Sequence, residues 1–154
     1  MVPGWQMDSL LIQSLVTTKG VRMKTCQGSC HCGAVRFEAD IQLNAGTIRC
    51  NCSICAKLRL WSAIVKPEAF RLMAGEAELS EYRFLEKTEQ HLFCRHCGVR
   101  PFGIGHSPRW GKFYAVNLAC LDNVTPEELA NAPITWLDGK NDQWETPPAE
   151  IRHL

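Results

Sequence analysis

The clearest periodic pattern in the chain lies between residues 34 and 41, where apolar and polar side chains alternate. The apolar positions of this segment are Val35, Phe37, Ala39 and Ile41. Such a period of two predicts a strand with one buried face. Further short segments rich in β-branched and aromatic residues, broken by Gly, Pro, Asn or charged residues, occupy 46–50, 60–66, 70–75, 80–86, 89–94 and 112–121. The pattern therefore predicts a mainly β protein.

Helical signals are few. Thr125 is a typical N-cap, Pro126 follows at the first helical position, and Glu128 completes a capping box. Pro133 ends this short C-terminal helix. Residues 66–70 predict a single turn for a similar reason, and the glycine-rich segment 103–107 is interpreted as a flexible loop.

Length and composition point to one domain. A chain of 154 residues, 45% of them hydrophobic, can bury one substantial core. Residues 1–22 show neither strand alternation nor turn chemistry, so they are interpreted as an N-terminal extension, disordered or loosely docked, before a single domain at 23–154. The opening residues lack the basic region of a secretory signal, which predicts a cytoplasmic protein.

The charge balance and hydropathy argue against two classes of partner. A net charge of +1 gives no broad positive field for a phosphate backbone, so nucleic acid is not expected. No apolar run reaches the roughly 20 residues that span a bilayer, so no membrane partner is expected either. The sequence makes no prediction of oligomeric state.

Cysteines change the picture, because seven of the nine fall in three tight clusters. The clusters are Cys30 and Cys32, then Cys50, Cys52 and Cys55, then Cys94 and Cys97. A reducing compartment disfavours structural disulfides, whereas closely spaced thiolates are ligands that Zn²⁺ prefers. Metal binding is therefore the favoured interpretation.

The seven cysteines divide into a group of four and a group of three. The two pairs together make a closed four-cysteine site, a structural zinc held by Cys30, Cys32, Cys94 and Cys97. The remaining three, Cys50, Cys52 and Cys55, would hold a second zinc with an open fourth position, as in catalytic sites. Three alternatives stay open: a redox dithiol at Cys94 and Cys97, an iron–sulfur cluster, and a fourth protein ligand such as Cys26, Cys120 or a histidine.

Three motifs in this order, GSCHCGAVRFE, RCNCSICAK and FCRHCGVRPFG, resemble the glutathione-dependent formaldehyde-activating enzyme family. The resemblance runs from about residue 24 to residue 144 and includes YAVNLACLD and DGKNDQW. It implies a β-tent of small antiparallel sheets and the same division of the cysteines between a structural and a catalytic zinc. Two positions depart from the family pattern: Asn51 stands where many members have histidine, and Ala56 where many have arginine.

The resemblance also implies a function. The family's activity joins formaldehyde to the thiol of glutathione, giving S-(hydroxymethyl)glutathione, or reverses that step. We therefore expect a carbon–sulfur lyase-type enzyme with two zinc ions per chain and a small thiol such as glutathione as ligand. The basic residues near the motifs could pair with the glutathione carboxylates, with Lys57 and Arg59 as the first candidates; the others are Arg49, Arg95 and Arg100. The alternative is a non-catalytic binding module in which both metals are structural.

Overall fold

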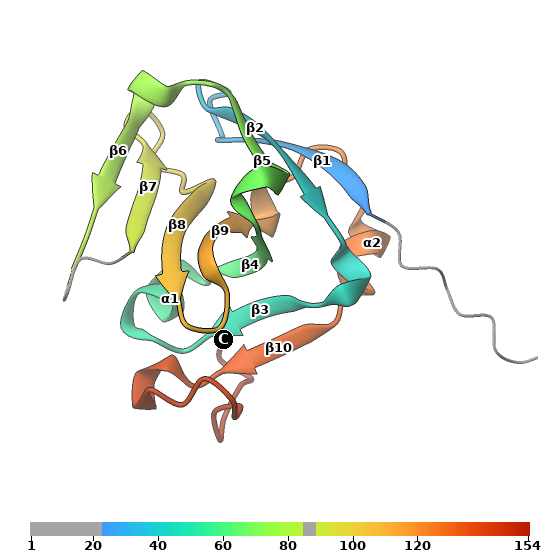
Figure 1. Ribbon diagram of the computed structural model, residues 1–154, viewed down its shortest axis with the longest axis vertical. Helices are drawn as coiled ribbons and strands as arrows, with labels where there is room; N and C mark the ends of the chain where they lie inside the picture. Colours follow the sequence, from blue (N-terminus) through green and yellow to red (C-terminus); the bar gives the residue numbers. More distant parts are fainter. Residues whose placement is uncertain (1–22, 85–88) are drawn as a thin grey trace, which may run out of the picture.

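The chain folds into two β-sheets, shown in Figure 1. This computed structural model describes residues 23–84 and 89–154. The three-stranded sheet has the order β1-β2-β5, with β1 at Lys24–Ser29, β2 at Arg36–Ile41 and β5 at Phe70–Ala74. The seven-stranded sheet has the order β10-β3-β4-β9-β8-β7-β6. In chain order its strands are β3 (Thr47–Cys50), β4 (Trp61–Val65), β6 (Leu79–Tyr82), β7 (Gln90–Cys94), β8 (Phe102–Ser107), β9 (Gly111–Asn117) and β10 (Ile134–Leu137).

Helices are short and lie at the ends of strands. The α-helices of the described residues are α1 (Ser53–Leu58) and α2 (Pro126–Ala130). Single 3-10 turns are η1 (Leu43–Ala45), η2 (Pro67–Ala69), η3 (Glu76–Glu78), η4 (Leu118–Cys120) and η5 (Gly139–Asn141). The predicted mainly β class with a short C-terminal helix is thus confirmed. No helix in the described part of the chain is long and apolar enough to cross a membrane.

The core lies between the two sheets. The alternation predicted for residues 34–41 is confirmed, because all four apolar positions of that segment are at most 2% exposed. Phe37 of β2 stacks on Phe70 of β5 with ring centroids 5.6 Å apart. Phe102, from β8 in the other sheet, makes a T-shaped contact with Phe37 at a centroid distance of 5.8 Å. Aromatic burial from both sheets therefore holds them together.

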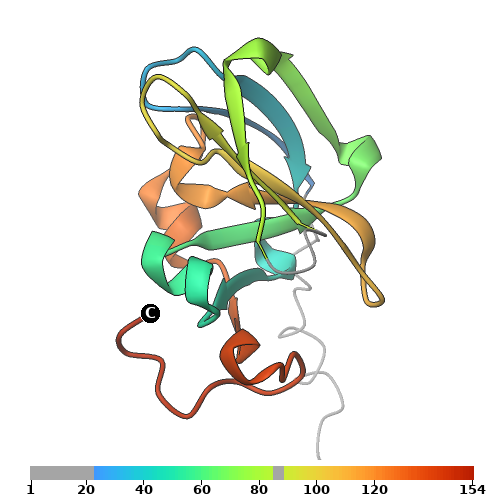
Figure 2. The same cartoon turned by 90° about the vertical axis from the view of Figure 1, so that its left-hand side faces the viewer.

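One edge of the larger sheet departs from antiparallel pairing. β10 runs parallel to β3, with Leu137 opposite Cys50. Figure 1 shows these two strands side by side, and Figure 2 shows the chain after β10 continuing beneath them. This arrangement brings residues that follow β10 to the end of β3, where a cysteine cluster begins.

Two local predictions are wrong. Segment 103–107, expected to be a loop, belongs to β8, which pairs with both β7 and β9. The strand expected at 112–121 ends at Asn117, because the Asn117 side chain accepts a hydrogen bond from the Ala119 N–H (3.1 Å) and caps η4. Strands β1 and β10 and helix α1 had no clear periodic signal. The predicted extension at 1–22 lies outside the described residues.

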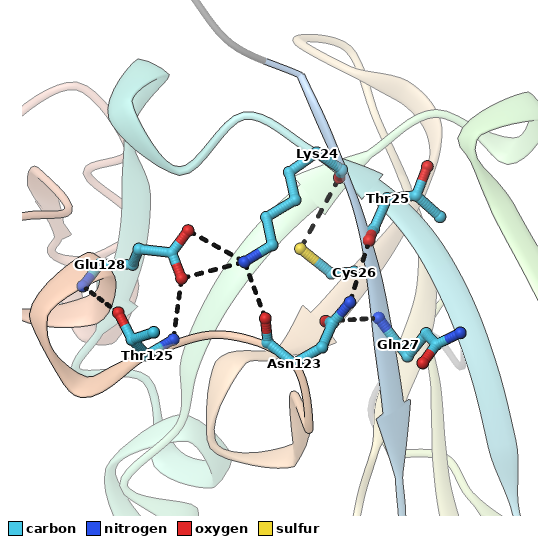
Figure 3. A network of polar contacts seen from close by, with 7 residues as sticks. All are labelled: Lys24, Thr25, Cys26, Gln27, Asn123, Thr125 and Glu128. Atoms are coloured by element: carbon cyan, nitrogen blue, oxygen red, sulfur yellow. Dashed lines mark hydrogen bonds and ion pairs between the residues drawn. The ribbon is translucent and has the colours of Figure 1, made fainter.

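The predicted capping box of α2 is present and also connects distant parts of the chain, as Figure 3 shows. The Thr125 hydroxyl accepts from the Glu128 N–H (3.1 Å), and the Glu128 carboxylate accepts from the Thr125 N–H (2.8 Å). The same carboxylate accepts from the Lys24 ammonium on β1 at 2.9 Å. Asn123 accepts from the Gln27 N–H (2.8 Å) through its side chain. The start of the small sheet is thereby fixed to α2.

Candidate metal centres

The first centre consists of the four cysteines at two strand ends. Cys30 and Cys32 lie just beyond β1, Cys94 is the last residue of β7, and Cys97 lies in the turn that follows. All four sulfurs lie within 4.8 Å of one another, and Cys32 Sγ is 3.6 Å from both Cys30 Sγ and Cys94 Sγ. A tetrahedral zinc with sulfurs at about 2.3 Å requires sulfur separations of about 3.8 Å. The group therefore has the size of a four-cysteine zinc site.

Two glycines form the turns that aim these sulfurs. Gly33 and Gly98 have φ of +76° and +74°, the left-handed region that other residues avoid. The Gly98 N–H donates to the Cys94 carbonyl (2.8 Å), and the Gly33 N–H donates to the Cys30 carbonyl (3.0 Å). Further N–H groups point at sulfur: that of Val35 donates to Cys30 Sγ at 3.3 Å. Such donors stabilise thiolates, the form that binds metal.

The effect of such N–H donors on the pKa of a thiol is clear at Cys97. Backbone N–H groups of Cys32 and Val99 donate to its sulfur and lower the pKa of Cys97 to about 6. A thiol with this pKa is largely a thiolate at neutral pH. The turn is therefore prepared for a cation before one binds.

The second centre lies at the end of β3. Cys50 is the last residue of that strand, Cys52 precedes α1 as its N-cap, and Cys55 lies in the helix. The three sulfurs lie within 4.8 Å of one another, and the Cys52 N–H donates to Cys50 Sγ at 3.3 Å. Hydrogen bonds from the thiols of Cys50 and Cys55 lower the pKa of Cys52, whereas the contacts of Cys55 with Cys50 and Cys52 raise the pKa of Cys55.

The loop after β10 closes against this centre. Asn51 donates to the Asp138 carboxylate (2.6 Å) and accepts from the Lys140 N–H (2.9 Å). Gly139 approaches so closely that an added Cβ would lie 2.7 Å from Cys50 Sγ and 2.9 Å from the Trp144 ring. Asn51, which departs from the family pattern, therefore fastens the loop to the cysteine segment. The hydrogen bonds from Asn141 and Asn51 lower the pKa of Asp138 and keep it ionised.

Within residues 23–84 and 89–154, no fourth His, Cys, Asp or Glu joins the three sulfurs at comparable separation. Two candidates for that role point elsewhere. Cys26 Sγ lies 3.7 Å from the Lys24 carbonyl, and Cys120 Sγ lies 3.8 Å from the Arg100 carbonyl. Burial raises the pKa of both thiols, that of Cys120 to about 11, which favours the protonated form.

The basic residues predicted to bind carboxylates differ in position. Lys57 is exposed on α1. Arg59 is exposed at the C-cap of α1 with φ of +51°, and it borders a crevice beside Cys50 and Cys55. Arg49 lines the same crevice, and its guanidinium lies over the rings of Trp61 and Trp136 at 5.2 and 5.9 Å.

Sequence reasoning counted Arg100 among several basic residues that could pair with carboxylates and gave His91 no role. The structure places Arg100 partly buried and His91 buried. When ionised, Cys55 and Cys52 favour the charged form of Arg100, and Cys52 favours the charged form of His91. No sequence signal separates Arg100 from Arg95, because both follow cysteines of the same turn. His31 and His96, beside ligands in the turns, are exposed.

Comparisons with known proteins agree with this geometry. Residues 25–138 match the family model described as glutathione-dependent formaldehyde-activating enzyme. The crystal structure of a Rhodobacter sphaeroides protein, a structural genomics target, is similar with a TM-score of 0.61 and 34% sequence identity. The match covers 71% of this chain and 99% of that one. The chain therefore belongs to the glutathione-dependent formaldehyde-activating enzyme family.

Proposed function

We propose that the protein is a zinc-dependent carbon–sulfur lyase-type enzyme that resembles S-(hydroxymethyl)glutathione synthase. The observation that carries the proposal is the unequal pair of cysteine groups, four sulfurs in one and three in the other. The family membership supports the substrate class, a small thiol such as glutathione together with a one-carbon aldehyde.

The two cysteine groups would have different roles. Cys30, Cys32, Cys94 and Cys97 would hold a structural zinc that joins the turn after β1 to the turn after β7. Cys50, Cys52 and Cys55 would hold the second zinc and leave one coordination position for an external ligand. When bound there, Zn²⁺ would accept a thiol sulfur and lower its pKa, so that the ligand is a thiolate at neutral pH.

The chemistry then requires little beyond positioning. The thiolate sulfur forms a bond to the aldehyde carbon and the carbonyl π electrons move to the oxygen. That oxygen takes a proton from solvent, which balances the proton that the thiol lost to solvent. The reverse step breaks the same carbon–sulfur bond and releases the aldehyde. The hydrogen bonds of Asn51 and the close approach of Gly139 hold the loop after β10 against the cysteines. Lys57 and Arg59 would pair with the glutathione carboxylates from the exposed rim. The cytoplasmic location remains a prediction.

The test is a thiol titration of the cobalt-substituted protein. We expect glutathione to change the visible spectrum of the metal held by Cys50, Cys52 and Cys55, while S-methylglutathione, which lacks the thiol, leaves it unchanged. A Cys52→Ser variant should lose this response, whereas Cys120→Ser, which removes a buried thiol outside both groups, should keep it.

Turnover is measured separately by NMR, as the rate at which S-(hydroxymethyl)glutathione exchanges with glutathione and formaldehyde at equilibrium, with and without protein. A spectrum that does not respond to glutathione would support the alternative, a binding module in which both metals are structural. A response to glutathione without any acceleration of exchange would contradict the enzymatic part of the proposal.

A further inference from the structure

Arg100 is a cation without a matching acceptor beside the second centre. Its Nε and Nη1 atoms are fully shielded from solvent and have no hydrogen-bond partner among the described residues. The backbone of Arg100 is fixed, because its carbonyl accepts from the Asn117 side chain at 3.0 Å. A guanidinium stays charged under all ordinary conditions, so burial of its donors without an acceptor is costly.

The sheet makes room for this side chain. An added Cβ at Gly103 of β8 would lie 2.3 Å from Arg100 Nη2 and 3.0 Å from the Gln90 carbonyl oxygen, so the guanidinium rests against the bare backbone of the strand. Gly103 is paired with His91 of β7, which is 4% exposed and whose Nδ1 also has no partner within the described chain. Burial, and then the charge of Arg100, lower the pKa of His91 to about 4, so the imidazole is neutral at pH 7. His91 therefore does not add a second charge.

Nearby negative groups compensate Arg100 only at a distance. When ionised, Cys55, Glu89 and Cys52 each favour the charged form of Arg100. None of them forms an ion pair with its Nε or Nη1 in the described structure. Three thiolates around a divalent cation have a net charge of about −1. This charge attracts Arg100 to the centre but does not satisfy its directional donors.

We propose that Arg100 is the oxyanion-binding residue of the Cys50, Cys52 and Cys55 centre, and that its buried guanidinium donates to an anionic oxygen of the substrate. This inference rests on the proposed function, since it assumes that a thiol ligand reaches that centre. The oxygen has two possible sources: a carboxylate of the thiol substrate, or the oxygen of the carbon–sulfur adduct. In the second case Arg100 stabilises the negative charge that develops on the aldehyde oxygen when the carbon–sulfur bond forms.

The experiment compares thiol ligands that differ in whether they offer an anionic oxygen, and from which group. Cobalt-substituted protein is titrated with 3-mercaptopropionate, with its methyl ester, and with the ester plus formaldehyde, and dissociation constants are taken from the metal spectrum. The variants are Arg100→Met, an unbranched neutral replacement, and Arg100→Gln, a polar one that serves if the first does not fold. Arg95→Met is the matched control, an exposed arginine of the same turn. Thermal unfolding and metal content verify that each variant is folded.

Two results support the proposal. If the source is the carboxylate, the wild type binds the acid at least about tenfold more tightly than the ester, and the Arg100 variants lose this preference. If the source is the adduct oxygen, the variants weaken binding only when formaldehyde is present, by a similar factor. The acid-over-ester and formaldehyde effects of the wild type are measured without any variant, so their joint absence overturns the proposal even if neither variant folds.

Other results also overturn it. An equal loss of affinity for acid, ester and adduct would show that Arg100 acts on the thiolate charge alone. If Arg95→Met loses the same affinities, the effect does not depend on where the arginine lies relative to the second centre. A thiol response that does not depend on Arg100 refutes this inference and leaves the proposed function intact, whereas the absence of any thiol response in the wild type refutes both.

Discussion

Gly139 offers a way to disturb the second cysteine centre without removing a ligand. Its φ is not in the left-handed region, so a Gly139→Ala substitution introduces no backbone strain. The effect comes from contact alone: the new Cβ would lie 2.7 Å from Cys50 Sγ, 2.9 Å from the Trp144 ring and 3.1 Å from Cys52 Cβ. Trp144 is 45% exposed and can move, but Cys50 is 9% exposed and fixed at the end of β3.

The size of the effect follows from these distances. Nonbonded heavy atoms do not repel each other at separations of about 3.5 Å or more. Cys50 Sγ would therefore have to shift relative to the loop by about 0.8 Å. Metal–ligand distances tolerate deviations of only about 0.2 Å. We therefore expect metal affinity at this centre to fall by roughly 10- to 100-fold, the range found when groups that orient ligands are changed. Overpacking should also lower the free energy of unfolding by about 1–3 kcal/mol.

The assay is competition with a chromophoric zinc chelator, which resolves the more weakly held of two metals. Lys140→Ala is the matched control, because this exposed neighbour contributes its backbone N–H, and not its side chain, to the bond with Asn51. If Gly139→Ala releases the second metal at the same chelator concentration as the wild type, the inferred contact between the loop and Cys50 is refuted.

Three further perturbations test other parts of the structure. Cys30→Ser should prevent folding, because the free energy of metal binding at the four-cysteine site is free energy of folding, whereas Cys52→Ser should remain folded; circular dichroism and metal content distinguish them, and a folded Cys30→Ser protein would contradict a structural role. Thr125→Ala should lower the free energy of unfolding in urea by about 0.5–2 kcal/mol by removing the N-cap of α2, and an unchanged value would show that the capping box is not formed in solution. The Arg71 guanidinium donates to both Asp40 carboxylate oxygens, at 2.9 and 3.1 Å, and with the Thr25 hydroxyl lowers the pKa of Asp40 to about 2, below its usual value of about 4 in the unfolded chain. Because the folded pKa is the lower one, this contribution is present above pH ~4 and is lost as the pH falls toward ~2. Urea unfolding at neutral pH, where the contribution is fully present and the cysteines keep their metal, should give a lower free energy of unfolding for Arg71→Met than for the wild type, and equal values would count against the ion pair.

Local patterns determined several features of this protein. The alternation at 34–41 fixed which face of β2 is buried, because side chains of a strand point to opposite sides in turn. The spacing of Thr125 and Glu128 fixed the start of α2, since the capping box closes within one turn. Cysteine spacing and the following glycines indicated turns that direct two sulfurs to one point, and the structure brings the four sulfurs together as expected.

Contacts between distant segments were decided only by the tertiary structure. The parallel pairing of β10 with β3 places Gly139 against Cys50, and nothing in either segment specifies the other. Arg95 and Arg100 follow cysteines of the same turn, yet one is exposed and the other has buried donors, because the Arg100 side chain lies over Gly103. Strand alternation, helix caps and the cysteine turns depend on interactions within a few residues, so the sequence alone reveals them. The environment of a side chain depends on which strands become neighbours, and that is settled by the packing of the whole chain.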